Sequence, residues 1–181
     1  MKKLLSLVLA LTMVAGLLAG CGSKEPVETT TPKASVEGTM EELLNKVIEI
    51  QPVEFMGSTM ALDLTKTDEE SLWQIKSFTG LEDASQIVEA AAYEPMIGSI
   101  AFSMVMVRVA PGADAKAVAE SMKAGVDPRK WVCVGADQMK VAGYSDVVML
   151  IMLDSATELD AQSFVDAFTQ VVGGTADFVL E

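Results

Sequence analysis

Histidine is absent from this chain of 181 residues, and cysteine occurs only twice, at Cys21 and Cys133. Without histidine the chain has no Ser-His-Asp or Cys-His catalysis, no histidine-ligated zinc and no imidazole base. The sequence also lacks Ser-x-x-Lys, Gly-rich phosphate loops and calcium loops of EF-hand spacing. These absences exclude many enzyme classes, although a hydrolase that uses paired carboxylates stays open.

Basic residues are also scarce, because 13 Lys and Arg stand against 26 Asp and Glu, a formal net charge of −13. Removal of residues 1–20 would delete Lys2 and Lys3 but no acid, leaving 11 basic and 26 acidic residues, a net charge of −15. Nucleic-acid phosphates and anionic lipid surfaces both attract clustered Lys and Arg. We therefore expect no nucleic-acid partner, and any lasting membrane contact must come from an anchor.

The first 21 residues have the layout of a secretory signal. Met1-Lys2-Lys3 is followed by a stretch without charge from Leu4 to Ala19, shorter than the roughly 20 residues that a spanning helix needs. Leu18-Ala19-Gly20-Cys21 resembles the lipobox of bacterial lipoproteins, which implies a diacylglyceryl group on Cys21 and cleavage before it. Two acyl chains anchor a protein stably. The alternatives are an uncleaved anchor helix and an ordinary signal peptide.

Three segments are therefore expected: a signal peptide at 1–20, a lipidated cysteine with a flexible linker at 21–39, and a single domain at 40–181. The linker is rich in Pro, Thr, Ser and Glu and has little apolar surface to bury. With Cys21 lipidated, Cys133 has no disulfide partner within the chain. Between Val132 and Val134 we expect Cys133 to be a buried small hydrophobe; nearby Arg129 and Lys130 keep a reactive thiol as the alternative.

Apolar periodicity predicts an α+β fold. Helices are expected at 40–51, 68–79, 115–126 and 156–172, with capping boxes at Thr67–Glu70 and Ser155–Glu158 and an apolar side on the second helix that includes Trp73. Strands are expected at 87–93, 100–109, 139–142 and 147–153, with a short fragment at 131–134. The order predicts a two-layer β-β-α-β-β-α domain, preceded by N-terminal helices. Its antiparallel sheet of about four strands carries helices mainly on one face.

Methionines and acids provide two further candidate sites, both of which we interpret structurally. Met104, Met106, Met149 and Met152 could bind Cu(I) through sulfur, but they lie among Val, Leu and Ile, which favours core filling. Asp68-Glu69-Glu70 lies in a first helical turn, where acids favour the helix dipole. We therefore expect no metal, no cofactor and no catalytic residue that can be named.

The stretch "DPRKW" is the best candidate for a recognition surface. It contains two adjacent basic residues, Arg129 and Lys130, beside Trp131, and Arg and Trp are favoured anchors of interfaces. The alternative is a loop in which Trp131 fills the edge of the core while Arg129 and Lys130 are solvated.

From Met40 onward the chain resembles a family of small lipoproteins of Gram-positive bacteria that is described only as a domain of unknown function. The resemblance is carried by "SFTGLED", "EPMIGSIAFSMVMVRVAPGADAKAVAESM", "PRKW", "VAGYSDVVMLIMLDS" and "FVDAF". It implies a lipoprotein with an α+β domain and brings no catalytic residue with it.

These observations together predict a lipid-anchored protein on the extracytoplasmic face of the cell membrane. Its domain would be a non-catalytic binding or interaction module for an envelope protein or ligand. An envelope hydrolase that uses carboxylates and a small-ligand receptor are the alternatives.

Overall fold

One open antiparallel sheet of six strands organises the computed structural model, which describes residues 33–181. The strands are β1 (Gly57–Ala61), β2 (Ile87–Pro95), β3 (Phe102–Val109), β4 (Gln138–Tyr144), β5 (Val147–Leu153) and β6 (Phe178–Leu180). Their order across the sheet is β1-β2-β3-β5-β4-β6. The α+β class is confirmed, as is the hairpin that pairs β4 with β5.

Four helices complete the fold: α1 (Met40–Ile50), α2 (Glu69–Thr79), α3 (Ala115–Gly125) and α4 (Ala161–Val172). Thr39 and Glu42 form the capping box of α1. The two capping boxes predicted further along are wrong. Asp68 caps α2 by accepting the N–H of Ser71, and residues 155–157 form only the short 3₁₀ helix η1, with α4 starting after Asp160.

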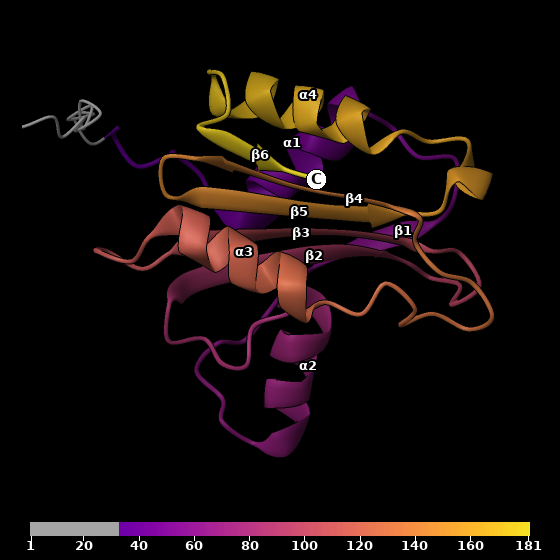
Figure 1. Cartoon of the computed structure of the whole chain (residues 1–181), viewed down its shortest axis with the longest axis horizontal. Coiled ribbons are helices and arrows are strands. Elements are labelled where there is room, and N and C mark those ends of the chain that lie inside the picture. The colour runs from indigo at the N-terminus through magenta and orange to yellow at the C-terminus, as the bar shows by residue number, and fades with distance from the viewer. Residues whose placement is uncertain (1–32) are drawn as a thin grey trace, which may run out of the picture. The chain divides into compact units, whose positions relative to one another are not determined.

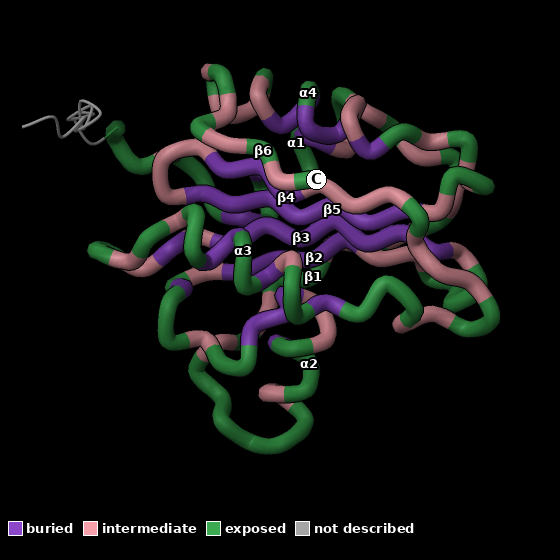
Figure 2. The backbone as a smooth tube through the Cα atoms, in the orientation of Figure 1, coloured by how far each residue is buried: buried purple, intermediate pink, exposed green. Residues whose placement is uncertain are grey.

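The helices cover both faces of the sheet, so the predicted two-layer arrangement is wrong. Figure 1 shows α1 and α4 on one side of the strands and α2 and α3 on the other. The reason lies in the central strands, because every residue of β5 and all but one of β3 are buried, as Figure 2 shows. Strands without a polar face need cover on both sides.

The core-filling interpretation of the methionines is confirmed. The four methionines considered as copper ligands are all fully buried: Met104, Met106, Met149 and Met152. The first three lie in the cluster beneath α1 and α4, and Met152 lies in the cluster beneath α2 and α3. Their unbranched side chains fill the space between strands and helices on each face.

The predicted four-strand sheet is wrong because two short edge strands were missed. β1 comes from a segment that the sequence left ambiguous, and it separates α1 from α2, so the two helices do not simply precede the sheet. β6 is three residues long and pairs with β4. Short edge strands alternate over too few residues to produce a clear pattern. The strand fragment predicted at 131–134 is a loop.

Residues 33–38 are bound to the sheet, and we call them the strap. The Arg108 guanidinium donates to the carbonyls of Val36 at 3.0 Å and Gly38 at 2.6 Å and pairs with Asp146 at 2.7 Å. Asp146 in turn accepts the N–H of Val36 at 3.0 Å. Residues 33–38 of the segment expected as a linker thus contact the sheet, and the linker up to residue 32 lies outside the described residues.

We predict that acid releases the strap. Burial raises the pKa of Asp146, but hydrogen bonds from Ser35 and Val36 and the charge of Arg108 outweigh it, so the pKa lies below its ordinary value of 3.8. A carboxylate whose pKa is lower in the folded state than in the unfolded state stabilises the fold at pH values above the unfolded-state pKa. This stabilisation is lost as the pH falls through the folded-state pKa. The hydrogen-exchange protection of the Val36 amide should therefore decrease as the pH is lowered from about 3.8.

Asp146→Asn should lower that protection already at neutral pH, by roughly 2 kcal/mol of opening free energy. Asp63→Asn is the control, because the pKa of Asp63 is also lowered, by hydrogen bonds from Thr65, at an exposed position whose partners, Thr65 and Lys66, lie outside the strap. Unchanged protection in Asp146→Asn would show that another contact holds the strap.

Candidate functional site

A hollow of about 780 Å³ lies between α2 and the loop that joins α3 to β4. We call it the tryptophan hollow, because both tryptophans of the chain line it. Its walls consist of Trp73, Lys76, Ser77 and Phe78 from α2, Glu94 from β2, and Gly125, Asp127, Arg129, Lys130 and Trp131 from the end of α3 and the loop. All three residues that the sequence proposed for a recognition surface are among them.

Lys130 holds the loop against the sheet. Its Nζ lies 2.7 Å from Oε1 of Glu94 and donates to the hydroxyl of Ser103 at 3.0 Å, and only 11% and 14% of the Lys130 and Glu94 side chains are exposed. The ammonium also lies 4.9 Å from the centre of the Phe78 ring. Desolvation lowers the pKa of Lys130, and the charge of Glu94 opposes this shift. The alternative interpretation, in which Lys130 is solvated, is therefore wrong for this residue.

Ser103 belongs to this cluster but is not placed as a nucleophile. The residue is fully buried on β3 and does not line the hollow. Its hydroxyl donates to Glu94 and accepts from Lys130, so the lysine is a donor here and not a base. The three groups neutralise and hydrogen-bond one another, which is the arrangement that buried charges need.

Arg129 and Trp73 are exposed residues of the hollow, as are Lys76, which pairs with Glu82, and Asp127. Arg129 is exposed, and its guanidinium has no carboxylate within 4.0 Å in the part of the chain that the structure describes. Its backbone N–H donates to Asp127 at 2.8 Å. Trp73 is 65% exposed, so the hollow offers a free planar cation and a free aromatic face.

Trp131 has the role that the alternative interpretation gave it. Its ring is half-buried and packs against the core under α2 and α3. Its indole N–H is buried and has no acceptor among the described residues. The structure thus brings the three residues together but gives each a different role. Arg129 is exposed, Lys130 holds the loop to Glu94, and Trp131 fills the edge of the core.

Sequence reasoning missed Trp73 and Glu94 as parts of the site. Trp73 was assigned to the apolar side of its helix, but it lies two positions before the buried Ile75, and positions i and i+2 lie on opposite sides of a helix. That spacing was the available signal. No local pattern marks Glu94, because its partner Lys130 comes from a loop 36 residues away.

The prediction that Cys133 is buried is wrong. The residue is exposed, as is the neighbouring Val132 at 67%. The backbone of Cys133 has φ +64°, because the loop reverses after Lys130 and Trp131 have turned inward. Apolar neighbours in sequence indicate burial only where the backbone is a regular strand or helix.

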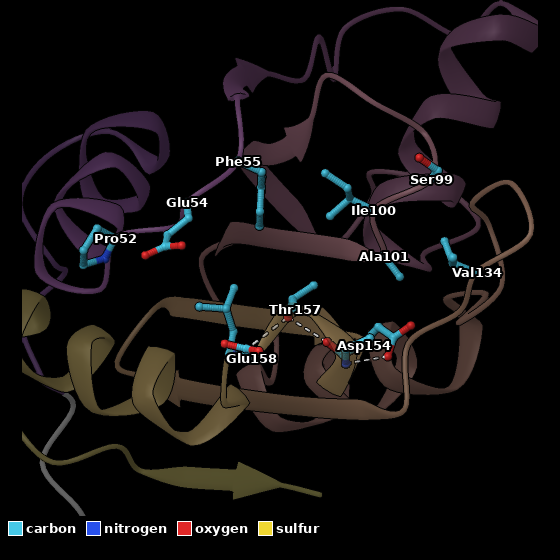
Figure 3. A pocket seen from close by; sticks show the side chains of 12 residues that line it. Pro52, Glu54, Phe55, Ser99, Ile100, Ala101, Val134, Asp154, Thr157 and Glu158 are labelled. Carbon is cyan, nitrogen blue, oxygen red and sulfur yellow. Dashed lines mark hydrogen bonds between the residues drawn. The ribbon is translucent and has the colours of Figure 1, made fainter.

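A second hollow of about 490 Å³ contains carboxylates (Figure 3). Glu54 comes from the segment between α1 and β1, whereas Asp154 and Glu158 flank η1. The carboxylate of Asp154 accepts the N–H of Ala156 at 2.9 Å and so serves as a cap. Within residues 33–181, no group of three or more Cys, Asp or Glu side chains is arranged to hold a metal ion.

The predicted lipid attachment site, Cys21, lies outside the described residues. Among the helices of residues 33–181, none is both long and apolar enough to cross a membrane.

Stability tests the role of Lys130. Lys130→Met leaves Glu94 buried without its cation and should lower the free energy of unfolding by about 3–5 kcal/mol. The double variant Glu94→Gln/Lys130→Met removes both charges and should recover most of this loss. Urea denaturation measures both. Lys66→Met is the control, because Lys66 and its partner Asp63 are 61% and 48% exposed and such surface pairs contribute at most about 1 kcal/mol.

The pH dependence provides a second readout. Because the pKa of Lys130 is lowered, the folded state binds fewer protons than the unfolded state between that pKa and the ordinary value of 10.5. The free energy of unfolding should therefore rise with pH in this window in the native chain relative to the double variant. The coupling would be contradicted if the losses in Lys130→Met and Glu94→Gln alone added up to the loss in the double variant. Equal pH profiles of the native chain and the double variant would contradict it as well.

A scan against protein-family models, a search of curated proteins and a search of solved structures found no match to this chain.

Proposed function

We propose that this chain is a lipid-anchored extracytoplasmic protein whose domain is a non-catalytic binding module at the cell envelope. The anchor is a diacylglyceryl group on Cys21, which supports attachment to the outer face of the cell membrane. The acidity of the mature chain is consistent with this proposal, because an anionic lipid surface would not hold such a domain without an anchor. The resemblance to uncharacterised lipoproteins implies the same location.

The observation that carries the binding role is the tryptophan hollow. It presents a Trp73 ring that is largely exposed and an Arg129 side chain that has no acidic partner within residues 33–181, in a chain of net charge −13. Trp and Arg are the side chains that contribute most at recognition surfaces. The charged groups beneath them, Lys130 and Glu94, are occupied with each other, which favours binding over catalysis.

The position of the hollow on the sheet supports the same role. Ser103 and Arg108 lie at the two ends of β3, about 17 Å apart at the rise of a strand. The hollow adjoins the Ser103 end, and the strap that leads back to the proposed anchor is held at the Arg108 end. Figure 1 shows the β4–β5 turn and the α3–β4 loop on opposite sides of the molecule. The hollow therefore lies at the end of the domain opposite the strap, where a tether at the strap leaves it open to a partner.

The second hollow favours the alternative of an envelope hydrolase, because Glu54 and Glu158 reach it from different segments. A receptor for a small ligand could use either hollow.

We expect lipidation to depend on Cys21. In cells supplied with labelled palmitate, the protein should incorporate label and partition into the detergent phase on cloud-point extraction. Cys21→Ala should lose the label and remain in the aqueous phase, whereas Cys133→Ala should behave as the native chain. Detergent partition that survives Cys21→Ala would point to an uncleaved anchor helix instead.

The binding role predicts retention on isolated cell envelopes of the source bacterium. Trp73→Ala and Arg129→Gln should each weaken retention of the detergent-solubilised protein about tenfold, the effect expected for one lost anchor contact. Lys116→Gln is the matched control, because Lys116 is exposed and lies on α3 outside the hollow. If retention depends on Glu54 and Glu158 and not on Trp73 or Arg129, the second hollow is the functional site.

A further inference from the structure

We propose that the tryptophan hollow binds an anionic saccharide, a ligand that combines a ring with an apolar face, a carboxylate and several hydroxyl groups. This inference rests on the proposed binding role and names the ligand class of the same site. Three properties of the hollow lead to it: a free aromatic face, a free guanidinium and carboxylates with unused acceptor capacity.

The aromatic face is that of Trp73. An indole that is 65% exposed beside a concave surface is a platform on which the C–H face of a sugar ring can stack, since the faces of aromatic rings are negative and attract the slightly positive C–H groups. The hollow has a volume of about 780 Å³, within the range of roughly 300–1,000 Å³ found for small-ligand sites. It can therefore hold one or a few sugar rings.

The guanidinium of Arg129 selects an anion. The chain has 26 acidic residues, yet none of those in residues 33–181 pairs with this side chain. Guanidinium binds a carboxylate through two parallel hydrogen bonds. Arg129 is therefore the carboxylate-binding group that we assign to the hollow.

The acids of the hollow distinguish a saccharide from an aromatic or aliphatic acid. Asp127 uses Oδ1 to accept the N–H of Arg129, and Glu94 uses Oε1 for Ser103 and Lys130. Their other carboxylate oxygens have no partner among the described residues. These oxygens repel a ligand that has only negative charge to offer, but they accept hydrogen bonds from hydroxyl groups.

Calorimetric titration of the lipidated protein in detergent micelles tests this inference. The probes are tetragalacturonate, its fully methyl-esterified form, which keeps the rings and hydroxyls without the charge, and phenylacetate, which keeps a ring and a carboxylate without hydroxyls. We expect saturable binding of tetragalacturonate, about tenfold weaker binding of the ester, and no binding of phenylacetate. Tryptophan emission should shift on binding, because both tryptophans line the hollow.

Trp73→Ala and Arg129→Gln should each weaken tetragalacturonate binding about tenfold, and Lys116→Gln should not change it. Circular dichroism identifies any variant that fails to fold, and both substitutions are at exposed positions. Equal binding of acid and ester, preference for phenylacetate, or no binding of tetragalacturonate would overturn the ligand class. If envelope retention still depends on Trp73 and Arg129 in that case, the binding module stands with another ligand; if it does not, the proposed function fails as well.

Discussion

Burial of β3 and β5 on both faces is the constraint on which the rest of the molecule depends. Strands made almost entirely of Val, Leu, Ile, Met and Phe expose apolar surface on each side, and each side must be covered. Helices α1 and α4 cover one face, and α2 and α3 cover the other. The second layer places α2 beside the loop after α3, which creates the tryptophan hollow.

The buried pair of Lys130 and Glu94 then determines how that loop lies. An ammonium group removed from water needs a partner, and Glu94 and Ser103 provide it. Because Lys130 points inward, the chain orients its neighbours differently. Trp131 fills the edge of the core and Arg129 faces the hollow. The next two residues, Val132 and Cys133, face solvent. One buried contact thus orients both the recognition groups and the exposed thiol.

Prediction from the sequence succeeded where periodicity extends over many residues. Three of the helices and the four long strands were expected close to their actual bounds, whereas α4 begins five residues later than expected. The central position of β3 followed from apolar residues at both alternating sets of positions. Failures occurred where the pattern is short or a partner is distant. β6 has three residues, the cap of α2 moved from Thr67 to Asp68, and the strap is held by Arg108, which is 70 or more residues away in sequence.

By itself, the sequence determined the class of the fold, its acidity, the absence of histidine chemistry and the grouping of Arg129, Lys130 and Trp131, because these depend on composition and local spacing. Only the tertiary structure decided the three layers, the pairing of Lys130 with Glu94, and the meeting of Trp73 with Arg129 across a hollow. Each of these joins segments that are far apart in the chain. Such long-range contacts form because they bury apolar surface and compensate buried charges. No local sequence pattern indicates which distant residues will come into contact.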